Sequence, residues 1–571
     1  MTRQHTPISY VSGISDTPLK GQTIGDCFDE TVARFPDRDA LISLHQDLRY
    51  TWQELQAAVD QAARALLALG VKKGDRVGIW SPNCAEWTIT QFATAKIGAI
   101  LVNINPSYRT HELEYALKQS AASTLILQGR FKGSDYVATL AELVPELQEE
   151  RAPELRDGGP GTFRSAKLPE LERVVCLDAD RALTGMFSWQ SMLAHANEVS
   201  AELLAEVQAT LQFDDAINIQ YTSGTTGAPK GATLSHHNIL NNGFFVARTM
   251  ALTEEDRMVI PVPLYHCFGM VMGNLGCVTH GATMIYPGDG FDPEATLRAV
   301  SEEKATTLYG VPTMFIAELE HPEFERFDLS SLRTGIMAGS ICPIEVMRKV
   351  IERMNMKDVT ICYGMTETSP VSFQTQTDAP LEKRVTTVGT IHPHLEVKLV
   401  SPETGAAVAR GETGELCTRG YSVMLGYWNN EEATAKAIDS AGWMHTGDLA
   451  TMDDEGYVAI VGRIKDMIIR GGENIYPREI EDFLYTHPAI SDVQVIGVPD
   501  EKYGEEVMAW VKLADGQQLT ADELKEFCKG KIAHYKIPRY VKFVDEFPMT
   551  VTGKIQKFKM REEATHELGL E

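Results

Sequence analysis

Residues 216–231 read AINIQYTSGTTGAPKG, an apolar run that gives way to a loop of glycines and hydroxyls closed by a lysine. The run AINIQ has the β-branched character of a buried strand end. A glycine-rich loop directly after a strand is where α/β folds bind ligands. Glycines let backbone N–H groups approach an anion, hydroxyls donate hydrogen bonds, and Lys230 adds a positive charge. The loop is therefore a candidate phosphate site, with a plain surface turn as the alternative when it is taken alone.

The loop is not the P-loop of nucleotide triphosphatases, whose pattern is G-x-x-x-x-G-K-[ST]. Gly224 fits the first position, but Pro229 stands before Lys230 in place of a glycine. Gly231 then stands where a P-loop has the hydroxyl that holds Mg²⁺. These differences disfavour a phosphotransferase that converts ATP to ADP.

Outward from this loop, strand-like and helix-like segments alternate from about residue 20 to about residue 460. Residues 51–70 repeat apolar side chains at helical spacing and stop at a glycine. The near-continuous apolar runs, which fit parallel strands covered on both faces, are 76–80, 99–106, 123–129, 282–288, 305–312, 333–340 and 359–367. The alternation predicts the α/β fold class with doubly wound sheets.

Three stretches depart from this pattern. Residues 146–171 are charged and rich in proline and glycine, which predicts an inserted connector. Shorter strands and turns between about 385 and 445 predict a small β-rich subdomain, and a charged, glycine-rich junction follows at 462–477. We expect an N-terminal region, 1–464, of two α/β subdomains plus the β-rich one. A small mobile α+β C-terminal domain, 465–571, would complete the chain.

Composition narrows the class of protein. A chain of 571 residues predicts several domains, and a formal net charge of −26 argues against a nucleic-acid partner, which needs a basic surface. No apolar run reaches the roughly 18 residues of a transmembrane segment, and the N-terminus lacks the apolar region of a secretory signal. The nine cysteines, an odd number without a C-x-x-C pair, predict a reduced, cytoplasmic chain without structural zinc.

Two later motifs carry side chains suited to a nucleotide. CYGMTET (362–368) ends an apolar run with an aromatic ring, a glycine, hydroxyls and a carboxylate, which together suit a base, a phosphate and Mg²⁺. WMHTGDLA (443–450) predicts a tight turn in which Asp448 would accept hydrogen bonds from ribose hydroxyls. Taken singly, the first is equally an ordinary strand-to-loop turn, and the second a simple Asx turn.

Two further motifs carry isolated basic side chains. PLYHCFGM (263–270) places His266 beside aromatic residues, where a structural histidine is the simpler interpretation. TVTGKIQK (550–557) places Lys554 after a glycine, where a solvated surface lysine is the simpler interpretation.

In this order, YTSGTTGAPKG, YGMTE, TGD, GRIKDMI and TGK resemble the adenylate-forming superfamily of acyl-CoA synthetases, peptide-synthetase adenylation domains and luciferases. The resemblance extends from about residue 25 to residue 562, and within the superfamily it favours the medium-chain fatty-acyl-CoA synthetases. It implies an acid–thiol ligase that turns a carboxylic acid, ATP and CoA into acyl-CoA, AMP and pyrophosphate through an acyl-adenylate. A CoA ligase for an aryl, short thioether or branched acid is the alternative.

The resemblance also implies roles for individual residues. Those of the flexible loop that would bind the ATP phosphates are Thr222, Ser223, Gly224, Thr225, Thr226 and Lys230. Those that would contact adenine, α-phosphate and ribose are Tyr363, Gly364, Thr366, Asp448 and Arg463. Mg²⁺ would be held by Glu367 and Thr226. In the C-terminal part, Lys465 matches the hinge, Gly471 and Gly472 the loop along the CoA pantetheine, and Lys554 the adenylation lysine.

The acyl pocket follows from the same resemblance. His266 would gate it or orient the carboxylate, and the residues expected along it are Tyr265, Cys267, Met270, Tyr309, Gly310, Val311, Gly339 and Ser340. Glycines leave space here, and no tryptophan occurs in the three segments 266–270, 309–313 and 337–341 to cap a short pocket. A medium-length or moderately bulky acid therefore fits better than acetate.

Rival functions differ in observable ways. A peptide-synthetase module would continue into a carrier segment, for which about 17 residues after Lys554 leave no room. A luciferase-like or stand-alone adenylating enzyme shares the same apparatus and stays open. A regulatory protein without catalysis would be expected to lose Glu367, Asp448 or Lys554, and all three are present. The expected partners are thus a small carboxylic acid, ATP and CoA, with a homodimer left open.

Overall fold

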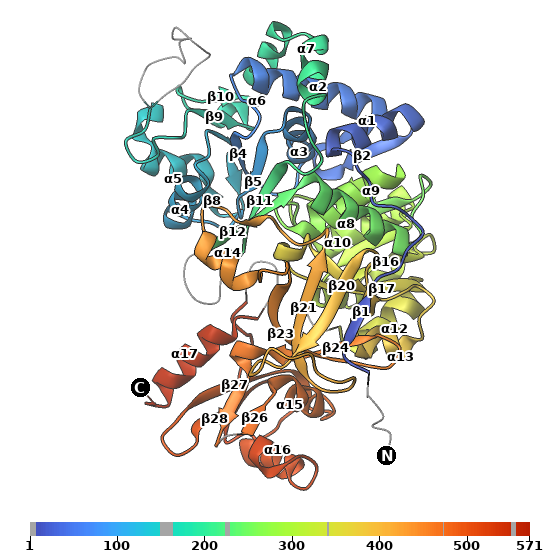
Figure 1. The fold of residues 1–571 in the computed structure, drawn as a ribbon, viewed down its shortest axis with the longest axis vertical. Coiled ribbons are helices and arrows are strands. Elements are labelled where there is room, and N and C mark those ends of the chain that lie inside the picture. The colour runs from blue at the N-terminus through green and yellow to red at the C-terminus, as the bar shows by residue number, and fades with distance from the viewer. Residues whose placement is uncertain are drawn as a thin grey trace. The chain divides into compact units, whose positions relative to one another are not determined.

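The computed structural model of the chain describes residues 7–148, 164–222, 229–339, 342–471, 473–549 and 555–570. Backbone contacts divide the chain into two compact units (Figure 1). The larger unit is Ser12–Glu396 with Arg419–Met444, and the smaller is Met1–Val11, Val397–Thr418 and His445–Glu571. The expected boundary at Lys465 divides the chain differently and stays a prediction.

The first sheet of the larger unit contains the strand that opens the phosphate loop, β11. Its strands, in spatial order, are β10 (Phe187–Ser188), β9 (Arg173–Cys176), β6 (Thr124–Leu127), β4 (Arg76–Trp80), β5 (Ile100–Asn103), β11 (Ala216–Thr222), β12 (Lys230–Ser235) and β22 (Gly426–Tyr427). Pairing is parallel from β10 through β11 and antiparallel from β11 to β22. The strands predicted at 76–80, 99–106, 123–129 and 216–220 are confirmed.

The second sheet of the larger unit is also largely parallel. Its strands, in order, are β19 (Thr390–Ile391), β18 (Val371–Gln374), β17 (Asp358–Gly364), β16 (Thr334–Ala338), β15 (Thr307–Gly310), β13 (Arg257–Val259), β14 (Thr283–Tyr286), β2 (Asp39–Ser43) and β3 (Leu48–Thr51). Pairing is parallel from β17 to β2 and antiparallel at both edges. A short hairpin, β7 (Arg130–Phe131) with β8 (Ser134–Asp135), lies apart from both sheets.

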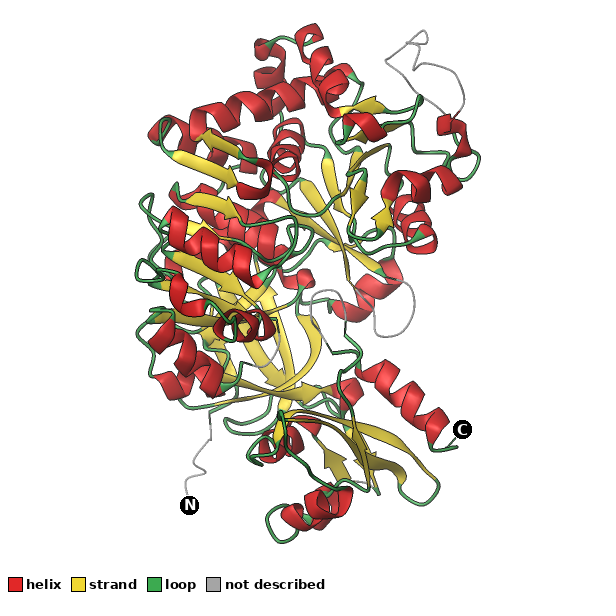
Figure 2. Ribbon diagram, turned by 180° about the vertical axis from the view of Figure 1, so that it is seen from behind, coloured by secondary structure: helices red, strands yellow, loops and turns green. Residues whose placement is uncertain are grey.

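Helices lie on both sides of the strands in this unit (Figure 2). They are α1 (Ile24–Arg34), α2 (Trp52–Ala68), α3 (Ala85–Ile97), α4 (Thr110–Ser120), α5 (Tyr136–Leu143), α6 (Trp189–Ala194), α7 (Ala201–Gln208), α8 (His236–Thr249), α9 (Gly276–His280), α10 (Pro293–Glu303), α11 (Pro312–Leu319), α12 (Ile344–Arg353), α13 (Leu381–Thr386) and α14 (Glu431–Ala437). A π-helix, η5 (Phe268–Leu275), precedes α9.

Strand side chains alternate between two cores, as expected for a sheet covered on both faces. On β5, Leu101 joins the core formed with α2 and α3, whereas Ile100 and Val102 join the core formed with α4 and α5. This is why the apolar runs are nearly continuous rather than alternating. The prediction of an α/β fold with doubly wound sheets is confirmed.

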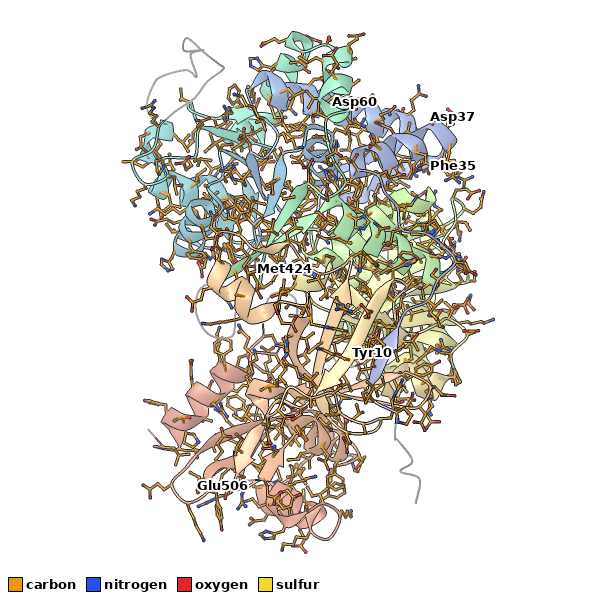
Figure 3. All side chains as sticks on the ribbon, viewed as in Figure 1. Tyr10, Phe35, Asp37, Asp60, Met424 and Glu506 are labelled. Atoms are coloured by element: carbon orange, nitrogen blue, oxygen red, sulfur yellow. The ribbon has the colours of Figure 1, made fainter. Side chains whose placement is uncertain are left out.

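The helix predicted at 51–70 is confirmed as α2. Residues close to each end determine where this helix begins and ends. The Thr51 hydroxyl accepts from the backbone N–H of Glu54, and the Glu54 carboxylate accepts from the N–H of Thr51, which forms a capping box. The helix ends before Gly70, which adopts φ +83°. Lys96 of α3 donates to Asp60 of α2 (labelled in Figure 3) and to Asp29 of α1, at 2.6 Å each. These two ion pairs of the buried Lys96 join the three helices.

The smaller unit contains residues 397–418 of the predicted β-rich part and the last hundred residues, whereas 385–396 and 419–444 belong to the larger unit. Its first sheet has the order β1 (Tyr10–Ser12), β20 (Leu395–Val400), β21 (Gly414–Gly420), β23 (Met444–Met452) and β24 (Val458–Arg463). The second has β26 (Glu473–Ile475), β25 (Ile468–Arg470), β28 (Gly504–Leu513) and β27 (Ile490–Asp500), with β29 (Tyr540–Phe543) parallel to β28. Its helices are α15 (Pro477–Leu484), α16 (Ala521–Cys528) and α17 (Lys557–Glu567).

The second sheet of the smaller unit has its own cores between strands and helices, built around residues such as Ile480, Val495 and Leu524 on one face and Trp510 and Met560 on the other. Arg470 of β25 forms a two-pronged ion pair with Glu506 of β28 (labelled in Figure 3), in which two guanidinium nitrogens each lie 2.8 Å from a carboxylate oxygen. The predicted α+β character of this region is confirmed.

Two expectations from composition can be checked on the described residues. No disulfide joins any of the nine cysteines, each of which lies in a described segment. Within those segments, no helix is long and apolar enough to cross a membrane.

Candidate active site

The phosphate loop departs from two antiparallel strands in the larger unit. Thr222, the last residue of β11, pairs with Lys230, the first residue of β12. The hydroxyl of Thr222 donates to the carbonyl oxygen of Lys230 at 3.4 Å. The pairing brings both ends of the loop together, as a phosphate cradle requires. The loop residues proposed to donate to phosphate, Ser223, Gly224, Thr225 and Thr226, lie outside the described residues.

Glu367 lies next to this strand pair. It belongs to the short 3₁₀ turn η7 (Thr366–Thr368) after β17, and its side chain is buried. The hydroxyl of Tyr427 donates to Glu367 Oε1 at 2.7 Å, and the Nζ of Lys230 lies 5.1 Å from the centre of the Tyr427 ring. The N–H of Met424 (Figure 3) donates to the carbonyl oxygen of Glu367 at 2.9 Å. Tyr427 therefore links the predicted phosphate lysine to the predicted metal ligand.

Tyr427 was missed from the sequence because its role depends on an edge strand far along the chain. β22 pairs with β12, with Tyr427 opposite Ala232, and this register brings the ring to Lys230. Burial and the neighbouring Glu367 carboxylate raise the pKa of the Tyr427 phenol, which therefore stays a protonated donor. In the sequence, only the two adjacent aromatic residues of GYW (426–428) indicate that an aromatic side chain could have a role here.

The donor set around Glu367 fits Mg²⁺. A buried carboxylate that receives one hydroxyl hydrogen bond is the hard oxygen ligand that Mg²⁺ prefers. The second predicted ligand, Thr226, is not among the described residues.

The residues predicted to contact adenine lie at the end of β17, just before the turn η7 that carries the predicted metal ligand Glu367. Tyr363 near the end of β17 is half-buried and packs edge-on against Phe373 at 6.0 Å. Gly364 follows, and a Cβ atom there would lie 1.7 Å from the carbonyl oxygen of Pro370. Any larger residue would push the strand away from this contact. Glycine at 364 therefore fixes the path of the backbone between Tyr363 and Thr366.

His266 precedes the π-helix η5 in the larger unit. Its Nδ1 accepts from the N–H of Phe268 at 3.1 Å, so the neutral ring carries its proton on Nε2. Its carbonyl oxygen accepts from the N–H groups of Gly269 and Met270. The histidine thus caps the helix start in addition to the role predicted for it.

The structure brings the predicted acyl-pocket segments together. Phe268 packs on Tyr309 with ring centres 5.3 Å apart, which joins the His266 segment to the 309–313 segment. Gly339, at φ +95°, lies beside Val311, since a Cβ there would be 3.1 Å from Val311 Cγ1. Gly310 lies in the same strand as Tyr309. Tyr265 is half-buried, and Ser340 is not among the described residues.

Cys267 and Met270 contact a residue that the sequence did not single out, Gln220. The thiol of Cys267 donates to Gln220 Oε1 at 3.0 Å, and Gln220 Nε2 donates to Met270 Sδ at 3.2 Å. Asn103 on β5 also donates to Met270 Sδ. Burial raises the pKa of the Cys267 thiol to about 12, so it stays protonated. These contacts attach the predicted acyl segment to β11. In the sequence, the polar Gln220 within an apolar run was the feature that could have indicated such a contact.

The predicted ribose residues lie in the smaller unit and contact each other. Asp448 on β23 pairs in register with Arg463 on β24, and Asp448 Oδ1 lies 2.9 Å from Arg463 Nε. The predicted tight turn around Asp448 is wrong, because residues 444–452 form strand β23. Gly447 adopts φ +71° within that strand, which explains why its sequence resembles a turn.

The remaining predicted residues of the smaller unit lie near its second sheet. Lys465 is exposed in the short 3₁₀ turn η8 (Ile464–Asp466) between β24 and β25. Gly471 adopts φ +60°, and its N–H donates to the carbonyl oxygen of Tyr503 at 2.8 Å. Gly472 and Lys554 lie outside the described residues.

Comparison with known families settles which family the chain represents. The family model described as AMP-binding enzyme matches residues 28–428. The chain belongs to the AMP-binding enzyme family. The model of the AMP-binding enzyme C-terminal domain matches residues 479–554. The predicted membership of the adenylate-forming superfamily is confirmed.

Two named relatives match this chain over nearly its whole length. A putative acyl-CoA synthetase, YngI, from Bacillus subtilis is 53% identical over 548 residues, which cover 96% of this chain and 98% of that protein. The mitochondrial medium-chain acyl-CoA ligase ACSF2 from Danio rerio is 48% identical over 564 residues, which cover 98% of this chain and 91% of that protein.

Solved structures of AMP-binding enzymes share the fold. The anthranilate CoA ligase AuaEII in complex with anthranoyl-AMP superposes with a TM-score of 0.80 at 27% identity, covering 97% of this chain and 99% of that one. ATP-bound MatB from Rhodopseudomonas palustris superposes with a TM-score of 0.78 at 27% identity, covering 94% and 98%.

Proposed function

We propose that the protein is an ATP-dependent acyl-CoA synthetase that acts on medium-chain fatty acids. Carboxylic acid, ATP and CoA would become acyl-CoA, AMP and pyrophosphate. The observation that carries the proposal is the array of Lys230, Tyr427 and Glu367 at the base of the phosphate loop. A cation, a phenol donor and a carboxylate placed together suit a phosphate chain with a metal ion. The named activities of YngI and ACSF2 support the same reaction class.

The first step joins two anions. The substrate carboxylate is already ionised at neutral pH, so it attacks the α-phosphorus without a general base. One carboxylate oxygen forms the new P–O bond, and the bond to pyrophosphate breaks. Lys230 would hold the leaving phosphates and Lys554 would offset charge between the carboxylate and the α-phosphate. Glu367 and Thr226 would hold Mg²⁺, whose charge offsets that of the phosphates.

The second step transfers the acyl group to CoA. The thiolate attacks the carbonyl carbon of the acyl-adenylate, the C–O bond to phosphate breaks, and AMP leaves with the substrate's oxygen. Gly471 and Gly472 would border the pantetheine. The positive φ of Gly471 is a backbone shape that other residues seldom adopt. His266 would orient the carboxylate or close the acyl site between the steps, with its Nε2 proton available as a donor.

Substrate choice rests on the acyl segments and on the relatives. Gly310 and Gly339 keep side-chain volume out of the segments that meet at Tyr309 and Val311. ACSF2 is named a medium-chain ligase, which favours an acid of that chain length. The anthranilate ligase is named for an aryl acid, which makes aryl acids the second candidate.

A panel of acids tests the substrate proposal. Acetate, butyrate, octanoate, palmitate and anthranilate would each be supplied with ATP, Mg²⁺ and CoA, and acyl-CoA formation measured. We expect kcat/KM for octanoate to exceed that for acetate and palmitate by at least about tenfold, since each buried methylene contributes about 0.8 kcal/mol until the pocket is filled. A preference for anthranilate would replace the proposal with the aryl alternative.

We further infer a cytoplasmic enzyme whose partners are small molecules. Nine cysteines without a disulfide suit a reducing compartment. The net charge of −26 is unsuited to nucleic acid. The ACSF2 relatives are named mitochondrial proteins, so location is best tested directly by fractionating cells that express the tagged protein.

A further inference from the structure

Glu415 holds the strand segment that carries Asp448. It lies on β21, next to β23 in the sheet, and its two carboxylate oxygens have different partners. Oε2 accepts from His445 Nδ1 at 2.9 Å, and Oε1 accepts from the backbone N–H of Gly447 at 3.2 Å. The Glu415 carboxylate thus binds the side chain of His445, before Thr446, and the peptide N–H of Gly447, after it.

Thr446 completes the attachment of this segment to β21. Its hydroxyl donates to the carbonyl oxygen of Leu416 at 2.8 Å and accepts from the N–H of Asp448 at 3.1 Å. Gly447 adopts φ +71°, and the pairing of β23 with β24 shifts register just beyond, between Leu449 and Ala450. The regular pairing of β23 with β24 is therefore interrupted next to Asp448. Hydrogen bonds from side chains help to fix the backbone there.

We propose that Glu415 is a positioning residue for Asp448 and that it sets how strongly the enzyme recognises the ribose hydroxyls of ATP. The proposal rests on the proposed function, in which Asp448 binds ribose. Asp448 is buried against Arg463, so its carboxylate can take only a narrow range of positions. A small shift of the Thr446–Asp448 backbone would move its oxygens out of hydrogen-bond range.

The same side chains raise the question of a metal site. Ligand-type atoms of Glu415, Cys417 and His445 lie within 4.8 Å of one another. His445 Nδ1 is already 2.9 Å from Glu415 Oε2, a hydrogen-bond distance, and 3.5 Å from Cys417 Sγ. These distances suit hydrogen bonds, and they also suit neighbouring ligands of one metal ion. Only the metal site would need the Cys417 thiol, so a variant of Cys417 distinguishes the two.

The test compares ATP with its 2′-deoxy and 3′-deoxy analogues in acyl-CoA formation. The wild type should use ATP at least about tenfold better than either analogue, because each analogue lacks one hydroxyl that donates a charge-assisted hydrogen bond to Asp448. Glu415→Ala should reduce that preference to within about threefold while the KM for the acid stays unchanged. Glu415→Gln should retain most of it, since the amide oxygen still accepts from Gly447. Cys417→Ser should behave as the wild type.

Each other outcome overturns the proposal. If Glu415→Ala keeps the wild-type preference, or raises the KM values for acid and ATP alike, Glu415 is only structural. Loss of the preference in Cys417→Ser as well would point to the whole cluster, including a metal. If the wild type itself does not distinguish ATP from its deoxy analogues, the ribose role of Asp448 fails together with the proposal. Continued acyl-CoA formation by that wild type would leave the proposed function standing.

Discussion

At the scale of single residues, Tyr427 makes the contacts that most closely join the predicted ATP residues of the larger unit. Tyr427→Phe keeps the ring beside Lys230 and removes the hydrogen bond to Glu367. A hydrogen bond to a charged group contributes about 1.5–3 kcal/mol, so we expect the Mg²⁺ concentration for half-maximal adenylation to rise by about tenfold or more. The measurement is the Mg²⁺ dependence of acid-dependent pyrophosphate release at saturating ATP.

The matched control for this variant is Tyr136→Phe. Tyr136 is a buried phenol that donates to the carbonyl oxygen of Pro106, among the helices α4 and α5. It should leave the Mg²⁺ dependence unchanged. An equal shift in both variants would assign the effect of Tyr427→Phe to general destabilisation.

Lys554 has the largest proposed role and the least distinctive sequence. If its charge acts in the transition state of adenylation, Lys554→Ala should slow acyl-adenylate formation by about 10²–10³-fold or more. Acyl transfer from a supplied acyl-adenylate to CoA should change much less. Assaying the two half-reactions separately on the mutant distinguishes these effects. Wild-type adenylation would show that Lys554 is a surface lysine.

A residue's role could be predicted from the sequence when the residues that define its motif are close to it in the chain. Thr222, Lys230, Glu367 and Asp448 were predicted because their motifs are short and continuous. Tyr427, Gln220 and Glu415 were missed, since their partners are 60, 47 and 30 residues away or more in the chain. Their roles depend on strand order and register, which a single sequence does not specify.

At the scale of elements, the parallel strands were predictable and the irregular ones were not. Buried strands such as β4, β5 and β16 have apolar side chains on both faces, and their sequences are correspondingly continuous. The strand β23 was predicted as a turn because TGD combines a hydroxyl, a glycine and a carboxylate, the usual turn residues. Side-chain support from a neighbouring strand overrides that local preference.

Helix α11 contains a buried acid without a described partner. Neither carboxylate oxygen of Glu318 has a hydrogen-bond partner among the described residues, and burial raises its pKa well above the ordinary value. The folded protein therefore retains a proton that the unfolded chain releases above about pH 4.3. Its stability contribution is present below that pH and is lost, at about 1.4 kcal/mol per pH unit, as the pH rises toward the folded pKa.

Glu318→Gln removes this proton linkage. The melting temperature of the variant relative to the wild type should rise steadily from pH 5 to pH 8. Thermal unfolding followed by circular dichroism across this range measures the difference. Glu320→Gln, an exposed acid one residue beyond the same helix, is the control and should show no trend. A constant difference for Glu318→Gln would mean that Glu318 is ionised in the folded protein.

At the scale of the whole molecule, the two half-reactions would need different placements of the C-terminal domain. We propose that this domain, 465–571, turns on the N-terminal region, 1–464, at Lys465. Lys465→Pro fixes φ at this position, so adenylation should survive while CoA transfer falls by about tenfold or more. Lys465→Ala, which keeps the backbone freedom, should retain both. Equal loss of both half-reactions in Lys465→Pro would contradict the hinge.

The central claim is that the substrate carboxylate attacks the α-phosphorus of ATP. Octanoate labelled with ¹⁸O in its carboxylate tests it directly when supplied with ATP, Mg²⁺ and CoA. The proposed mechanism predicts one ¹⁸O atom in the phosphate group of AMP, with octanoyl-CoA formed in equal amount and unlabelled pyrophosphate. Label in pyrophosphate or inorganic phosphate, or ADP in place of AMP, would contradict it.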